Sequence, residues 1–107
     1  MAQAKLPQSV INQVREYKKI LQADNLPVSG VYVFGSYAKG HATKDSDIDV
    51  AVVSPKFRSS WEALSYLYGK LPYGLGWLIE PIGFSPEDFE NKYSTLVHEI
   101  KKHGIKV

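Results

Sequence analysis

Residues 47–53 read Asp-Ile-Asp-Val-Ala-Val-Val, and this segment constrains the fold more than any other part of the chain. Its β-branched residues predict a buried strand. Side chains two positions apart on a strand lie on the same face of the sheet. We therefore expect Asp47 and Asp49 to project together, while Ile48 and Val50 point into the core. Any fold of this chain has to bring two carboxylates out at one end of a buried strand.

A second short strand is predicted upstream, and its end carries complementary chemistry. Residues 31–34 are β-branched or aromatic, and Gly35-Ser36 follows them directly. Glycine lets the backbone approach a ligand closely. We expect residues 37–40 to form one helical turn, whose first N–H groups provide an anion site. The Ser36 hydroxyl can donate a further hydrogen bond to a phosphate oxygen.

The two motifs together indicate a reaction at a phosphate. Neighbouring carboxylates repel each other unless a cation or a proton lies between them, and hard oxygen ligands favour Mg²⁺. One motif can hold a triphosphate and the other the metals that bridge it, as phosphoryl or nucleotidyl transfer requires. Singly, Asp-x-Asp is more often a solvated strand end, and Gly-Ser after a strand is usually a plain turn. The joint spacing, with Gly40 and Ser46, is what makes coincidence improbable.

Helical spacing and capping signals predict two helices in the first two thirds of the chain. The first spans residues 8–24 and is amphipathic. The second begins at Ser59, which forms a capping box with Glu62. Its expected apolar stripe consists of Trp61, Leu64 and Tyr68. We expect the tryptophans and most of the tyrosines to fill the core.

The C-terminal third is predicted to contain a loop, a strand and a helix. Residues 70–76 are rich in Gly and Pro and predict a loop. Residues 77–84 predict a strand, in which Pro81 favours an edge position. A single helix is expected from Ser85 to His103, with Gly104 as a left-handed cap. Its expected apolar stripe is Phe89, Tyr93, Leu96, Val97 and Ile100.

This order of elements predicts an α+β fold. With a final short strand at residues 105–107, we expect a small mixed sheet with helices packed on one face. A chain of 107 residues predicts a single domain, residues 1–107. The formal net charge of +2 is too small to indicate direct binding of nucleic acid or a membrane.

Absent sequence features narrow the prediction further. Without cysteine, neither disulfides nor thiolate metal sites are expected. The N-terminus does not resemble a signal peptide, and no apolar run approaches the length of a membrane span. We therefore expect a cytoplasmic protein.

The motif G-S-Y-A-K-G followed by S-D-I-D-V resembles the signature of the DNA polymerase beta-like nucleotidyltransferase superfamily. The whole chain is similar to its smallest branch, the MNT proteins of MNT–HEPN toxin–antitoxin pairs. The resemblance implies a polymerase beta-like core that uses ATP or another NTP, and Mg²⁺ in a two-metal site. Carried over by position, Gly35 and Ser36 would bind the triphosphate, and Asp47 and Asp49 would be catalytic and bind the metals.

The resemblance also implies a third carboxylate that acts as metal ligand and general base. The matching strand contains Glu80, one methylene longer than the more frequent Asp. An exposed strand residue is the alternative interpretation of Glu80. Lys39 stands where many members have Arg and would bind the nucleotide, although a solvent-exposed role fits it equally well, as it does Lys44.

The resemblance to MNT antitoxins implies transfer of AMP from ATP to a HEPN-domain partner, with the chain acting as antitoxin. Two alternatives stay open: an inactive module that neutralises its partner by contact, and a small-molecule nucleotidyltransferase of the aminoglycoside type. Some of Tyr66, Tyr68 and Tyr73 are expected to border the cleft. The acceptor, the base of the NTP and the oligomeric state, including a homo-oligomer, are left open by the sequence.

Overall fold

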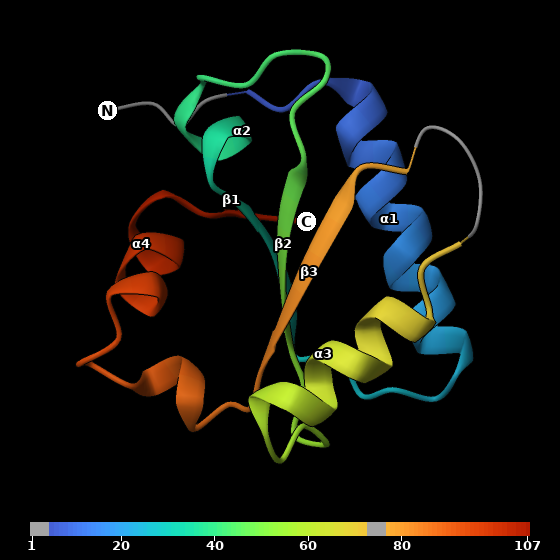
Figure 1. Ribbon diagram of the computed structural model, residues 1–107, viewed down its shortest axis with the longest axis vertical. Coiled ribbons are helices and arrows are strands. Elements are labelled where there is room, and N and C mark those ends of the chain that lie inside the picture. The colour runs from blue at the N-terminus through green and yellow to red at the C-terminus, as the bar shows by residue number, and fades with distance from the viewer. Residues whose placement is uncertain (1–4, 73–76) are drawn as a thin grey trace.

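The computed structural model describes residues 5–72 and 77–107. Helices and strands alternate along the chain, as Figure 1 shows. The elements are α1 (Gln8–Ala23), β1 (Gly30–Phe34), α2 (Ser36–Lys39), β2 (Ile48–Val53), α3 (Ser60–Gly69), β3 (Ile79–Phe84), the 3-10 turn η1 (Asp88–Glu90), α4 (Thr95–His103) and β4 (Ile105–Lys106). No helix within the described residues is long and apolar enough to cross a membrane.

The four strands form one mixed sheet in the order β3-β2-β1-β4. Strand β2 runs antiparallel to β1 and parallel to β3, and β4 runs antiparallel to β1. The predicted α+β class with a small mixed sheet is therefore confirmed, including the short final strand. Strand β3 lies at an edge, which accommodates Pro81 because its missing N–H is tolerated there.

The prediction that helices cover only one face of the sheet is wrong. Helices α1 and α3 pack on one face, whereas η1 and α4 pack on the other, as Figure 1 shows with α1 and α4 on opposite sides of the strands. The physical reason lies in β2, where Val50–Val53 are buried in succession. A strand that is apolar on both faces needs cover on both.

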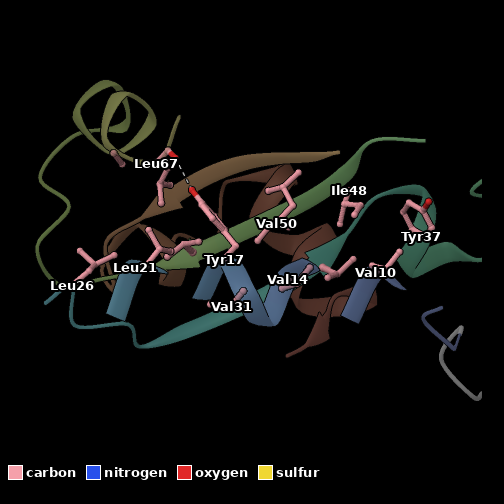
Figure 2. Close-up of a cluster of buried hydrophobic side chains, with 14 of the residues drawn as sticks. Val10, Val14, Tyr17, Leu21, Leu26, Val31, Tyr37, Ile48, Val50 and Leu67 are labelled. Atoms are coloured by element: carbon pink, nitrogen blue, oxygen red, sulfur yellow. Dashed lines mark hydrogen bonds between the residues drawn. The ribbon is translucent and has the colours of Figure 1, made fainter. Parts of the chain in front are cut away.

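The larger core lies between α1, α3 and the sheet, and one buried hydrogen bond crosses it. The Tyr17 hydroxyl of α1 donates to the Leu67 carbonyl of α3 at 2.6 Å, as the dashed line in Figure 2 marks. Burial raises the pKa of Tyr17 far above its usual value. Because both polar atoms are paired, the hydrogen bond offsets the cost of burying this hydroxyl in the core.

Helix α3 faces the sheet with a different stripe from the predicted one. Ala63 and Leu67 are buried, whereas Trp61 is 76% exposed, so the expectation of Trp61 in the core is wrong. A Cβ on Gly83 of β3 would lie 2.6 Å from the Cβ of Ala63, so helix and strand approach too closely for a large side chain.

The predicted cap of α3 is confirmed, since Ser59 accepts a hydrogen bond from the Glu62 N–H. Trp77 is partly buried against this core.

The single helix predicted from Ser85 to His103 is broken in the structure. The turn η1 ends at Glu90, and the side chain of the next residue, Asn91, accepts a hydrogen bond from the Tyr93 N–H. Ser94 then caps α4 by accepting from the Val97 N–H. Asn and Ser side chains compete in this way with the helical hydrogen-bond ladder. Tyr93, which the predicted stripe placed in the core, is 84% exposed as a result.

The end of α4 also differs from the expectation. Gly104 has an extended backbone, with φ −62° and ψ 144°, so the predicted left-handed cap is wrong. Its N–H donates to the Ile100 carbonyl at 2.7 Å, and the chain continues straight into β4. The predicted loop over residues 70–76 falls partly outside the described residues, and Lys70 caps α3.

Candidate active site

The strand register places two of the predicted site residues side by side. Asp49 of β2 is paired in parallel with Glu80 of β3 and in antiparallel with Phe34 of β1. Paired residues on adjacent strands point to the same face. Asp47 lies one residue before β2 and is exposed. The carboxylates thus lie on the α4 side of the sheet, at the end of β1 where α2 begins.

The Asp49 carboxylate is repelled by several neighbouring carboxylates. Burial raises the pKa of the half-buried Asp49 carboxyl, and the negative charges of Glu80, Asp47 and Glu99 raise it further. A carboxylate in such surroundings is stabilised by a cation or a proton. No local pattern points to Glu99, because it lies on α4, fifty positions further along the chain, and reaches the site only through the packing of α4 on the sheet.

Gly35 separates β1 from α2 and lies against Asp49. Its backbone has φ 72° and ψ −146°, a conformation that is essentially restricted to glycine. A Cβ at this position would overlap the Oδ2 atom of Asp49. The glycine is therefore required both by the turn and by the close approach of the carboxylate.

Helix α2 is a single turn that begins at Ser36, directly after the glycine that lies against Asp49. Its C-cap is Gly40, which has φ 77° and adopts the left-handed conformation. Tyr37 is buried and donates a hydrogen bond to the Thr43 carbonyl at 3.1 Å, so the turn is tied to the loop that leads to Asp47. Among the described residues, no side-chain hydrogen bond involves the Ser36 hydroxyl, which leaves it available to a ligand.

Lys39 does not extend freely into solvent. Its ammonium forms an ion pair with Glu99 of α4, and both side chains are about one-third exposed. The pair joins α2 to α4 across the face on which Asp49 lies. Lys44, in the loop before β2, is exposed and lines a different pocket, near the start of α1.

A pocket of about 300 Å³ opens next to the carboxylates. It is lined by Phe34, Asp49, Leu64, Tyr68, Glu80, Pro81 and Ile82. Of the three tyrosines expected near the cleft, Tyr68 is the one that lines this pocket. Tyr66 instead donates to Asp24 at 2.6 Å, and Tyr73 lies outside the described residues.

The donors suit a hard divalent cation by their chemistry. Asp47, Asp49 and Glu80 offer only carboxylate oxygens, which Mg²⁺ prefers. Within residues 5–72 and 77–107, however, no three His, Cys, Asp or Glu side chains are gathered tightly enough to form a ready-made metal group. The carboxylates are therefore suitable ligands for Mg²⁺. They would move closer together only around a cation that offsets their mutual repulsion.

Comparison with known proteins decides the family. A model described as "Nucleotidyltransferase domain" matches residues 14–107. The chain belongs to this family. All candidate site residues lie inside the matched range.

One relative shares substantial sequence identity with this nucleotidyltransferase domain. The chain is 41% identical over 59 residues to "Putative protein adenylyltransferase MJ1379" of Methanocaldococcus jannaschii. The match covers 50% of this chain and 58% of that protein, so the chain spans little more than half of its relative's length.

Solved structures show that the fold is shared. A "putative nucleotidyltransferase from Sulfolobus solfataricus" superposes with a TM-score of 0.60 at 20% identity, over 92% of this chain and 82% of that one. A "toxin-antitoxin with AMP-PNP" gives 0.57 at 24% identity, over 89% and 71%. The "tri-AMPylated Shewanella oneidensis HEPN toxin in complex with MNT antitoxin" gives 0.51 at 22% identity, over 91% and 70%.

Replacement of Gly35 by Ala should destabilise the protein by roughly 1–3 kcal/mol, because alanine is strained at this φ and its Cβ would displace Asp49. Gly69 of α3 is the matched control, since a Cβ there would meet nothing within 4 Å. We expect Gly69→Ala to be neutral or slightly stabilising. Urea unfolding of both variants measures the difference. Equal stability of the two variants would contradict the close approach of Gly35 to Asp49.

Replacement of Asp49 by Asn should raise the free energy of unfolding at pH 7 without metal, by up to about 1 kcal/mol because solvent screens these charges. The folded-state pKa of Asp49 is raised, so its charged form opposes folding at neutral pH. The wild type should recover the deficit as the pH falls through this raised pKa. Glu16→Gln, an exposed change on α1, is the control. Thermal unfolding at several pH values measures the effect, and a stability loss at pH 7 would show that Asp49 is structural.

Proposed function

We propose that this protein is a Mg²⁺-dependent nucleotidyltransferase that moves AMP from ATP to a hydroxyl of a protein partner. The observation that carries the proposal is the position of Asp49. It lies opposite Glu80, near Asp47, and against the Gly35-Ser36 turn. A phosphate-binding turn and a group of carboxylates on one sheet face are what nucleotidyl transfer needs.

The chain's own groups provide a place for the donor nucleotide. The bare backbone at Gly35 and the available hydroxyl of Ser36 would hold the triphosphate. Lys39 lies at the end of the same turn and would contribute a cation, exchanging its contact with Glu99 for one with phosphate. The exchange is feasible because the pair is partly exposed and therefore weak.

Asp47 and Asp49 would hold Mg²⁺, with Glu80 completing the acidic group. A bound ion supplies charge neutralisation at the phosphates and at the leaving oxygen. Glu80 would also accept the proton of the acceptor hydroxyl. Its exposed position on the edge strand β3 leaves it open to an incoming acceptor, which supports this role.

A HEPN-domain protein is our proposed acceptor, with the chain acting as antitoxin in the cytoplasm. The name of the relative from M. jannaschii and the toxin–antitoxin complexes of the same fold support this choice. A tyrosine hydroxyl is the chemistry we favour, because a phenol has a pKa near 10 and a carboxylate can assist its deprotonation. The apolar walls of the pocket beside Glu80 also suit an aromatic side chain.

Co-expression with a HEPN-domain protein tests the proposal. Mass spectrometry of the partner should show the mass of one or more AMP groups on tyrosine, dependent on ATP and Mg²⁺. Asp47→Asn and Asp49→Asn should abolish the adduct while the complex still forms, and Glu16→Gln should leave it intact. An unmodified partner that is bound tightly by wild type and variants alike would establish the contact-only alternative.

A further inference from the structure

Tyr68 is placed differently from the other tyrosines in the part of the chain that the structure describes. It lies in the last turn of α3, is 47% exposed, and lines the pocket that contains Asp49 and Glu80. No described residue forms a hydrogen bond with its hydroxyl. By contrast, the hydroxyls of Tyr17, Tyr37 and Tyr66 each donate a hydrogen bond to another residue.

The Tyr68 hydroxyl lies within the field of the carboxylate group. Partial burial raises the pKa of Tyr68, and the charges of Glu80, Asp47 and Asp49 raise it further, with Glu80 contributing most among the three. The proposed base is therefore the acid with the strongest influence on this hydroxyl. Phe34, Leu64 and Ile82 complete the apolar wall around it.

We infer that Tyr68 is itself an acceptor, so that the protein adenylylates its own α3. The inference rests on the proposed function, because the same carboxylates and the same nucleotide are required. It adds an activity in which donor site and acceptor belong to one chain. An unpaired phenol beside the proposed base is in the position that an acceptor from another protein would have to reach.

The step balances with a nucleoside triphosphate as the sole co-substrate. The Tyr68 hydroxyl oxygen attacks the α-phosphorus, and a new oxygen–phosphorus bond forms. The bond from the α-phosphorus to its bridging oxygen breaks, and pyrophosphate leaves with the electron pair. The phenolic proton passes to Glu80 and then to solvent. The product is a tyrosyl phosphodiester that carries AMP.

Modification at Tyr68 would change the site. The adduct would place a nucleotide and a negative phosphodiester at a pocket of about 300 Å³. It would add negative charge beside Asp49, which the surrounding acids already disfavour. An adenylylated chain should accordingly accept partner hydroxyls poorly, so self-modification would compete with transfer to a partner.

Tyr93 provides a matched control within the same chain. It is 84% exposed and so is even more accessible than Tyr68. It lies between η1 and α4 and does not line the pocket beside the carboxylates. If exposure alone decided modification, Tyr93 would be the preferred acceptor.

The test is incubation of the purified chain with ATP and Mg²⁺, followed by intact-mass analysis and peptide mapping. Wild type and Tyr93→Phe should gain one AMP on Tyr68, whereas Tyr68→Phe and Asp49→Asn should gain none. The rate should be independent of protein concentration, because the reaction occurs within one chain. An adduct that persists in Tyr68→Phe, or that maps to Tyr93, would overturn the inference.

A second measurement separates the inference from the proposed function. Thermal unfolding of the wild type and of Tyr68→Phe is measured with and without Mg²⁺ and a non-hydrolysable ATP analogue. A rise in melting temperature reports that the nucleotide site binds, and a cooperative transition shows that Tyr68→Phe is folded. A stabilised wild type that modifies a HEPN partner but never itself would overturn the inference alone. A wild type that is neither stabilised nor able to modify any protein would overturn the proposed function, and the inference with it.

Discussion

The position of β2 between an antiparallel and a parallel neighbour is the constraint on which the rest of the structure depends. This register sets Asp49 opposite the last residue of β1 on one side and opposite Glu80 on the other. The chain can then leave β1 only through a residue without a Cβ, because the Asp49 carboxylate occupies the space beside Gly35. The turn, the helical start at Ser36 and the acidic face are thus consequences of a single strand arrangement.

Burial on both faces of β2 links this arrangement to the helices. Val50 and Val52 pack against α1 and α3, while Ala51 and Val53 pack against η1 and α4. The cover provided by α4 also brings Glu99 next to Lys39 and within range of Asp49. Helix α4 therefore does two things besides covering the sheet: its Glu99 adds a negative charge near Asp49, and the same side chain pairs with Lys39.

Local pattern predicted the strands well and the helices less well. The β-branched runs depend only on neighbouring residues, and they located β1 and β2 correctly. The order of the elements predicted the small mixed sheet. The contact of α3 depends instead on how closely Ala63 approaches Gly83, which no helical stripe reveals. The break before α4 arises because the side chains of Asn91 and Ser94 accept hydrogen bonds from backbone N–H groups and so interrupt the helix, although the apolar residues keep a regular helical spacing.

Calorimetric titration with a non-hydrolysable ATP analogue, with and without Mg²⁺, tests most directly whether the carboxylates and the Gly35-Ser36 turn form one nucleotide site. We expect binding by the wild type that requires Mg²⁺, and a loss of at least about tenfold in affinity in Asp49→Asn, which corresponds to about 1.4 kcal/mol. Glu16→Gln should bind as the wild type does. Equally tight binding without Mg²⁺, or unchanged binding by Asp49→Asn, would contradict a metal-dependent site built on Asp49.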